Sequence, residues 1–186
     1  MPFHPLTTRS HWQSPLGLIL LSASPLGLSG VFFEDQRHLP DVQAWPEDPN
    51  NPFTQAAIAL LKDYFSGRAH ALDAPLSLPL DLQCGTTFQQ AVWQALLRIQ
   101  AGQTQSYGQL AQQVQRPSAV RAVGAAVGRN PISLLVPCHR ILGAAGQLTG
   151  YAGGLWRKEA LLKMEQALPG ALATPDTEHG TLPLFD

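Results

Sequence analysis

Residues 106–128 read SYGQLAQQVQRPSAVRAVGAAVG, and this stretch decides the fold of the carboxy-terminal half. Ser106 and Gln109 have the spacing of a helix capping box, and apolar side chains then recur at helical spacing until the Arg-Pro pair at 116–117. Ser118 is expected to open a second helix directly after this break. A helix, a short turn and a second helix together indicate a helix-turn-helix motif.

The second helix of this motif is slim. Alanine and glycine occupy six of the ten positions from 119 to 128, and Arg121 is the only long polar side chain among them. Small side chains allow a helix to approach another backbone closely. That backbone can belong to a nucleic acid or to a neighbouring helix, and the composition alone leaves both interpretations open.

Helical patterns flank the motif on both sides. Upstream, Thr87 and Gln90 are expected to form another capping box, and apolar positions recur until Gly102. Downstream, the apolar residues within 161–164 predict a further helix that carries Glu165. The second half of the chain therefore reads as a set of short helices.

The amino-terminal half begins with the alternating pattern of strands. Residues 16–21 and 28–33 predict a hairpin, and residues 1–13 are expected to be polar and irregular. A run rich in Pro, Asp and Asn at 39–52 predicts a loop, and helical spacing over 53–67 predicts one helix. This half reads as a small α+β unit, from which residues rich in Leu and Pro lead out as a linker.

Composition excludes several classes of protein. The chain has 186 residues, of which 45% are hydrophobic and 13% charged, and this balance is typical of a globular protein. The longest apolar run, at 16–21, is too short to cross a bilayer, so no membrane segment is expected. The same run loosely resembles a secretory signal, but the returning strand at 28–33 favours the hairpin.

Charge is divided unevenly along the chain, although the net charge is only -1. Residues 1–84 hold four basic and eight acidic side chains, whereas residues 85–165 hold eight basic and two acidic ones. No Asp or Glu occurs between Asp81 and Glu159. Such a region suits a polyanion, and the alternative is a lightly charged domain with solvated arginines.

The two cysteines, Cys84 and Cys138, are too few for a disulfide framework and indicate a reducing compartment, so a cytoplasmic location is expected. Cys138 directly precedes His139, and an imidazole with nearby positive charge is expected to lower the pKa of the thiol. Glu165 could orient the imidazole. The alternative is a buried, inert cysteine beside a surface histidine. Metal binding is not expected, because no second Cys-His pair has ligand spacing.

Taken in order, these motifs resemble the O6-alkylguanine-DNA alkyltransferase family. The likeness covers roughly residues 14–166 and centres on Pro-Cys-His-Arg at 137–140. The other matching segments are 85–93, 106–111, 121–124, 129–132 and 150–159, with weaker matches in the amino-terminal hairpin and at 61–67.

The resemblance implies an α+β protein with two domains and a tail. Residues 1–84 would form a small ribonuclease-H-like α/β domain with its linker, residues 85–168 a mainly helical, winged-helix-like DNA-binding and catalytic domain, and residues 169–186 a flexible acidic tail. The implied activity is that of a methylated-DNA–[protein]-cysteine S-methyltransferase, which repairs DNA by direct reversal. The O6-alkyl group of a flipped-out guanine would pass once and irreversibly to Cys138, and O4-alkylthymine is a second candidate substrate. The protein would work without cofactor or metal, as a monomer on the minor groove of double-stranded DNA.

The resemblance also implies roles for single residues. Cys138 would accept the alkyl group, His139 would act as base through a water, and Glu165 would orient His139. Asn130 would brace the active-site turn.

On the DNA side, Tyr107 would contact the flipped nucleotide, and Arg121 would fill the space that the base leaves in the stack. The rest of the DNA-binding surface would be formed by Ser106, Ala122 and Gly124. The pocket for the base would be lined by Val136, Tyr151 and Ala152.

Three other functions share parts of this pattern. A cysteine hydrolase would use the same Cys, His and Glu but would turn over many times. A non-catalytic sensor of alkylated bases would not need Cys138. A transcription factor would read the major groove with its second helix, but that helix offers only Arg121 to contact bases.

The tail ends in Thr-Leu-Pro-Leu-Phe-Asp at 181–186. Leu182, Leu184 and Phe185 resemble the anchoring positions of the short peptide with which bacterial polymerases and repair proteins dock on the sliding clamp, although Thr181 stands where glutamine is usual. A weak contact with the clamp is one prediction, and a tail that folds back onto its own domain is the alternative.

Overall fold

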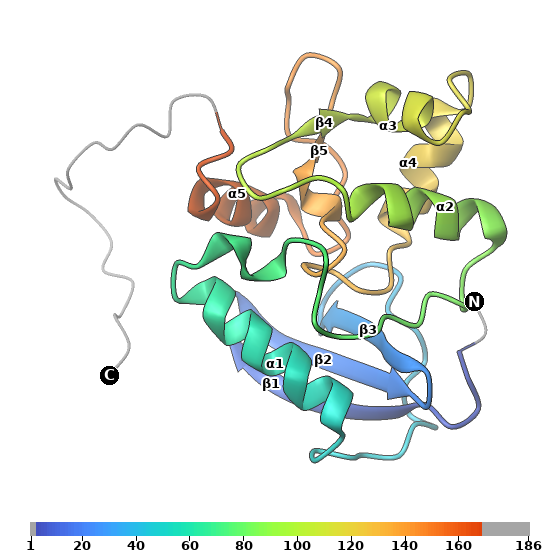
Figure 1. The fold of residues 1–186 in the computed structure, drawn as a ribbon, viewed down its shortest axis with the longest axis vertical. Coiled ribbons are helices and arrows are strands. Elements are labelled where there is room, and N and C mark those ends of the chain that lie inside the picture. The colour runs from blue at the N-terminus through green and yellow to red at the C-terminus, as the bar shows by residue number, and fades with distance from the viewer. Residues whose placement is uncertain (1–2, 169–186) are drawn as a thin grey trace, which may run out of the picture.

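The computed structural model describes residues 3–168 and shows a small sheet in the amino-terminal half and short helices in the carboxy-terminal half (Figure 1). The sheet has the order β1-β2-β3, and both pairs of strands are antiparallel. Its strands are β1 (Thr8–Ser14), β2 (Gly17–Ser24) and β3 (Gly27–Phe33). The predicted α+β class and the predicted hairpin are therefore confirmed.

Strand β1 corrects the prediction that residues 1–13 are irregular. The strand is polar, and it forms the outer edge of the sheet, where Ser10 lies opposite Leu21 of β2. Its backbone bonds to β2 while several of its side chains stay at the surface, so the hydrophobicity pattern gives little sign of a strand.

Helix α1 (Pro52–Phe65) lies across the sheet and agrees with the predicted helix (Figure 1). The Asn51 side chain caps it by accepting hydrogen bonds from the backbone N–H groups of Phe53 at 3.0 Å and Thr54 at 3.4 Å. One face of the helix is buried at helical spacing and packs towards the sheet. Its buried residues are Thr54, Ala57, Ile58, Leu61 and Tyr64.

The free edge of β3 is covered by two later segments of the chain. The Leu28 N–H donates to the carbonyl of Pro79 at 3.0 Å, and the Val31 N–H donates to that of Pro131 at 2.9 Å. Every residue of β3 is buried as a result. The segment after 3-10 helix η1 (Ala69–Leu72), which the sequence predicts as a linker, places Leu78 and Leu82 in the core.

The carboxy-terminal half contains the predicted short helices, with some shifts at their ends. The capping box of α2 (Thr87–Leu96) is formed by Thr86 and Gln89, one residue earlier than predicted. Ser106 and Gln109 cap α3 (Tyr107–Gln113) as predicted. Helix α4 (Val120–Gly128) starts after Ala119 without a side-chain cap, so the prediction for Ser118 is wrong.

Helices α2 and α3 pack against α4 and against each other. The indole Nε1 of Trp93 in α2 donates to the carbonyl of Ala126 in α4 at 2.9 Å, and Trp93 is fully buried. Strand β4 (Gln105–Ser106) pairs in parallel with β5 (Ile141–Leu142), and this pairing places α3 beside the chain that follows Cys138. The last described helix is α5 (Leu155–Met164). The predicted domain boundary near residue 84 stays a prediction.

Candidate active site

Cys138 lies on a buried turn between the sheet and the helices. It begins 3-10 helix η2 (Cys138–Arg140), and its side chain belongs to the hydrophobic core with a relative exposure of 4%. The preceding segment is wound tightly, because Leu134 has a φ of 73°, which is rare for a leucine and persists only where the surrounding packing imposes it. The fold therefore fixes the thiol in place and shields it from solvent.

Asn130 ties this turn together with its side-chain amide. Its Nδ2 donates to the carbonyl of Val136 at 2.7 Å and lies 3.1 Å from Sγ of Cys138. Its Oδ1 accepts from the N–H of Ile132 at 3.0 Å. A single buried side chain thus holds both ends of the turn and places an N–H donor at the sulfur.

The His139 side chain contacts a buried carboxylate. Its Nε2 lies 3.0 Å from Oε1 of Glu165, and both side chains are fully buried. Because an ionised carboxylate only accepts hydrogen bonds, Nε2 carries the proton and Nδ1 is the basic nitrogen. Nδ1 is buried and has no hydrogen-bond partner among the described residues.

Burial and the charges around His139 together set its protonation state. Burial lowers the pKa of His139, and this effect outweighs the opposing effect of Glu165, so the imidazole is neutral near pH 7. Burial alone would raise the pKa of Glu165, but His139 and Arg140 outweigh it and hold that pKa at about 2. Arg140 donates to Glu165 from Nε and from Nη2, both at 2.9 Å. The pair is therefore a neutral imidazole held by an ionised carboxylate.

The structure corrects the expected effect on the thiol. Burial raises the pKa of Cys138 above its ordinary value, although the Asn130 hydrogen bond and the charge of Lys158 act in the opposite direction. The sulfur is thus a protonated thiol near pH 7, and its proton must leave before it can act as a nucleophile. Cys84 is also buried, and its pKa is raised to about 11 by burial and by Asp81.

Lys158 belongs to the site but did not emerge from the sequence analysis as a site residue. Its ammonium group is buried and donates to the carbonyls of Ile141 and, at 2.6 Å, Thr149. Burial lowers the pKa of Lys158 to about 8, and the Cys138 sulfur opposes this shift. Its position three and four residues before the buried Leu161 and Leu162 was the available signal, because that spacing places Lys158 on the buried face of α5.

Tyr107 connects the helix-turn-helix to the chain that follows the thiol. It is the first residue of α3, and its hydroxyl donates to the carbonyls of Gly150 at 3.3 Å and Thr149 at 3.4 Å. Its ring lies 3.6 Å from where a Cβ on Gly124 would be, which is ordinary van der Waals contact, so the ring packs directly against α4 at this glycine. Helix α4 thus packs against the ring of Tyr107 through Gly124, whereas Arg121 of α4 is exposed.

The predicted site residues fall into two groups. One group is buried around the sulfur and comprises Asn130, Val136, Cys138, His139, Tyr151 and Glu165. The other lies at or near the surface of the helix pair and comprises Ser106, Tyr107, Arg121, Ala122 and Gly124, and Ala152 is half-buried next to Tyr151.

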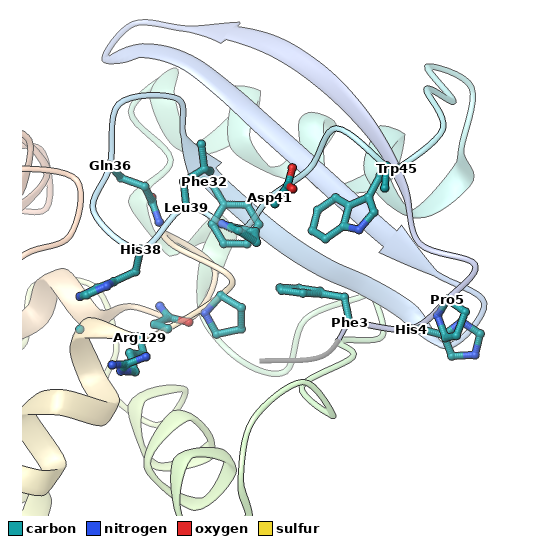
Figure 2. Close-up of a pocket in the computed structure, with 15 residues that line it drawn as sticks. Phe3, His4, Pro5, Phe32, Gln36, His38, Leu39, Asp41, Trp45 and Arg129 are labelled. Carbon is teal, nitrogen blue, oxygen red and sulfur yellow. The ribbon is translucent and has the colours of Figure 1, made fainter.

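Two cavities border the site without containing the sulfur. One of about 310 Å³ is lined by Asp35, Arg37 and residues 150–157, which include Tyr151 and Ala152 but not Val136. The other, of about 590 Å³, lies between residues 3–5, the loop after β3 and residues 128–131. In Figure 2, Arg129 and His38 lie at one end of it and Phe3 and Trp45 at the other.

Residues 3–168 contain neither a metal-binding cluster nor a membrane-spanning helix. In that range, His, Cys, Asp and Glu side chains form no group of three or more that could hold a metal ion. The described helices also include none that is long and apolar enough to cross a membrane.

Comparison with protein families matches both halves of the chain. Residues 8–82 match the ribonuclease-like domain of 6-O-methylguanine DNA methyltransferase, and residues 87–167 match its DNA-binding domain. The methylated-DNA–protein-cysteine methyltransferase of Mycobacterium leprae is 46% identical over 154 residues, which are 83% of this chain and 89% of that protein. The protein of the same name from Methanosarcina mazei is 44% identical over 83% of this chain and 94% of its own length.

Solved structures give the same result. The Mycobacterium tuberculosis OGT in complex with DNA has a TM-score of 0.76 and 41% identity, and the match covers 89% of this chain and 97% of that one. The O6-methylguanine-DNA methyltransferase of Pyrococcus kodakaraensis has a TM-score of 0.54 at 23% identity over 86% of this chain and 98% of that one, which supports the fold alone.

The buried carboxylate predicts a pH-dependent loss of stability in one variant. Glu165 has a pKa of about 2 in the fold and 4.5 ordinarily, so its charge stabilises the fold above about pH 5 and this contribution is lost as the pH falls towards 2. Glu165→Gln is expected to lower the free energy of unfolding by about 3 kcal/mol at pH 7, because it removes the carboxylate that pairs with the buried Arg140. Urea unfolding between pH 7 and pH 3 should show the difference from wild type shrinking below pH 5.

Glu159→Gln is the matched control for this experiment. Glu159 pairs with Lys163 at 2.9 Å on the exposed side of α5, and such a pair contributes less than about 0.5 kcal/mol. A Glu165→Gln effect that is equally small, or that stays constant from pH 7 to pH 3, would contradict the assignment of a buried ionised carboxylate.

Proposed function

The chain belongs to the 6-O-methylguanine DNA methyltransferase family, and we propose that it repairs alkylated DNA by moving the O6-alkyl group of guanine onto Sγ of Cys138. The observation that carries this proposal is the buried Cys138, with the Asn130 amide at its sulfur and the His139–Glu165 pair next to it in sequence and space. We extend the same proposal to O4-alkylthymine as a second substrate.

The first step is removal of the thiol proton. His139 is neutral, and its basic Nδ1 has no hydrogen-bond partner within residues 3–168, so this nitrogen can accept the proton of Cys138 through a bridging water. The resulting imidazolium donates from Nε2 to the ionised Glu165. Lys158, buried close by, adds a positive charge that favours the thiolate.

The second step is displacement at the alkyl carbon. The sulfur forms a bond to that carbon while the carbon–O6 bond breaks, and guanine leaves with the bonding electron pair. The hydroxyl of Tyr107 supplies a proton to the leaving base, and the proton held by His139 returns through water to Tyr107, so that the thiol proton ends on guanine. The product is a thioether, which no group of the site can hydrolyse, so each molecule acts once.

The lesion must leave the duplex before this reaction, because its alkyl carbon is hidden in the stack. We propose that α4 enters the minor groove, that Arg121 fills the space of the flipped base, and that Ser106, Ala122 and Gly124 complete the contact surface. The base then occupies a pocket with Val136, Tyr151 and Ala152 on its walls. Double-stranded DNA is the partner, and the protein acts on it as a monomer.

Stoichiometric labelling tests the central step. Incubation with a duplex that contains O6-methylguanine should add one methyl group to the intact protein and then stop, with the label on the peptide of Cys138. Cys138→Ala should gain nothing, whereas Cys84→Ala, which removes a thiol whose pKa is about 11, should gain one group as wild type does. A methyl group found on Cys84 would contradict the proposal. Removal of more than one methyl group per protein molecule would also contradict it and would favour a hydrolase.

Two substitutions separate DNA binding from chemistry. Arg121→Ala should slow transfer from duplex DNA by about tenfold, because filling the stack offsets part of a flipping cost of a few kcal/mol. It should leave transfer from free O6-benzylguanine unchanged, since Arg121 is exposed on α4. His139→Ala should slow both reactions without weakening DNA binding.

Arg98→Ala provides the control, because it removes the same charge from an exposed position outside α4. The measurements are the transfer rates with duplex DNA and with O6-benzylguanine, and the duplex affinities from fluorescence anisotropy. Together they separate DNA binding from alkyl transfer. Equal losses in Arg98→Ala and Arg121→Ala would reduce the role of Arg121 to general charge.

The sliding-clamp contact through Leu182, Leu184 and Phe185 lies outside the described residues and is proposed from sequence. A labelled peptide of residues 176–186 should bind a bacterial clamp at micromolar concentration, because the three apolar side chains can anchor in a hydrophobic groove. Leu184→Ala with Phe185→Ala should abolish binding, and Thr177→Ala should not. Absence of binding in the high micromolar range would exclude the contact.

A further inference from the structure

Tyr64 reaches the candidate active site from the other half of the chain. It lies in the last turn of α1, is 1% exposed, and donates from its hydroxyl to Oε1 of Glu165 at 2.9 Å. Glu165 follows α5, which lies close to the end of α1 in Figure 1. A direct hydrogen bond therefore links the helix on the amino-terminal sheet to the carboxylate that holds His139.

Three donors share one oxygen of Glu165. Besides Tyr64, Oε1 accepts from Nε2 of His139 at 3.0 Å and from Nη2 of Arg140 at 2.9 Å, while Oε2 accepts from Nε of Arg140. Arg140 is itself held by Asp73, whose Oδ1 lies 3.0 Å from Nη1. The carboxylate cannot rotate without losing several of these bonds, and two of the residues that fix it belong to the amino-terminal half.

We propose that Tyr64 is a positioning residue for alkyl transfer, which holds the Glu165 carboxylate in the orientation that His139 needs and moderates how strongly that carboxylate attracts the imidazole proton. This inference rests on the proposed function. It gives the amino-terminal half a part in the chemistry, through a group that touches neither the sulfur nor the substrate.

Charge on the shared oxygen explains the direction of the effect. Burial raises the pKa of Tyr64 far above its ordinary value, so its hydroxyl is always a donor and always draws negative charge away from the bond to His139. Without this hydroxyl, Oε1 binds the N–H of His139 more strongly, and the pKa of His139 moves up towards its ordinary value. Of the other charged or titratable groups, Arg140 acts on both residues, Lys158 acts on His139 and Tyr151 acts on Tyr64. Asp73 acts through Arg140, and Cys138 acts on Lys158 and Tyr151.

Tyr64→Phe removes the hydroxyl and keeps the ring. The rate of single-turnover transfer from O6-benzylguanine, measured from pH 5 to pH 9, should fall in this variant, and its acidic limb should move up by about one pH unit. Asp73→Asn keeps an acceptor for Arg140 but removes a negative charge near the pair, so its acidic limb should move in the opposite direction. The second variant also keeps the inference testable if Tyr64→Phe does not fold.

Leu61→Val is the matched control for packing. Leu61 is fully buried on the same helix, one turn before Tyr64, and has no polar group. This variant should unfold at lower temperature than wild type while its pH profile stays unchanged. A purely structural role for Tyr64 predicts the same behaviour for Tyr64→Phe.

The outcomes separate this inference from the proposed function. The positioning role is supported if wild type transfers the alkyl group and the acidic limb of the pH–rate profile moves to higher pH in Tyr64→Phe. A move of that limb to lower pH in Asp73→Asn also supports it. Transfer by wild type with unshifted limbs in both variants overturns the inference and leaves the proposed function intact. Failure of wild type to transfer at all overturns both.

Discussion

A carboxylate buried away from water is the constraint on which the rest of this structure depends. An ionised group in the interior is stable only if donors surround it, and Glu165 obtains them from two other parts of the chain. Tyr64 comes from the helix on the sheet, His139 and Arg140 come from the turn with the sulfur, and Glu165 itself follows α5. The two halves of the molecule therefore meet at a charge, and the same charge fixes the tautomer of His139.

In this arrangement the resting thiol is protonated and buried, and the groups that favour its reactive thiolate form already surround it. A buried, protonated sulfur is protected from the oxidants and electrophiles that attack exposed thiolates. The groups that favour the thiolate are already in place around it, since Asn130 donates towards the sulfur and Lys158 supplies a charge. Pre-arranged donors need no reorganisation when the negative charge develops, and this is how a fixed polar site lowers a barrier.

Local signals were sufficient for much of the fold and for the centre of the site. The capping spacing around Ser106, the apolar periods of the helices and the adjacent Cys138 and His139 depend on neighbours in sequence. The structure has α3 capped by Ser106 as predicted, and α4 follows it with a shifted start. The features that could not be predicted from the sequence depend on residues that are far apart along the chain. The Tyr64–Glu165 bond spans 101 residues, β1 is defined by its pairing with β2, and the raised thiol pKa follows from burial by many segments.

The covered edge of β3 bears on how the chain reaches its native state. Residues 79–81 supply one part of that cover, but residues 131–133 supply the rest, about a hundred positions after the strand itself. During synthesis the sheet emerges first and keeps an unpaired, apolar edge until most of the other half has left the ribosome. Contacts of such long sequence separation form slowly, and an open strand edge invites pairing with other chains in the meantime. The molecule is therefore most prone to aggregation as a nascent chain that stops short of residue 131.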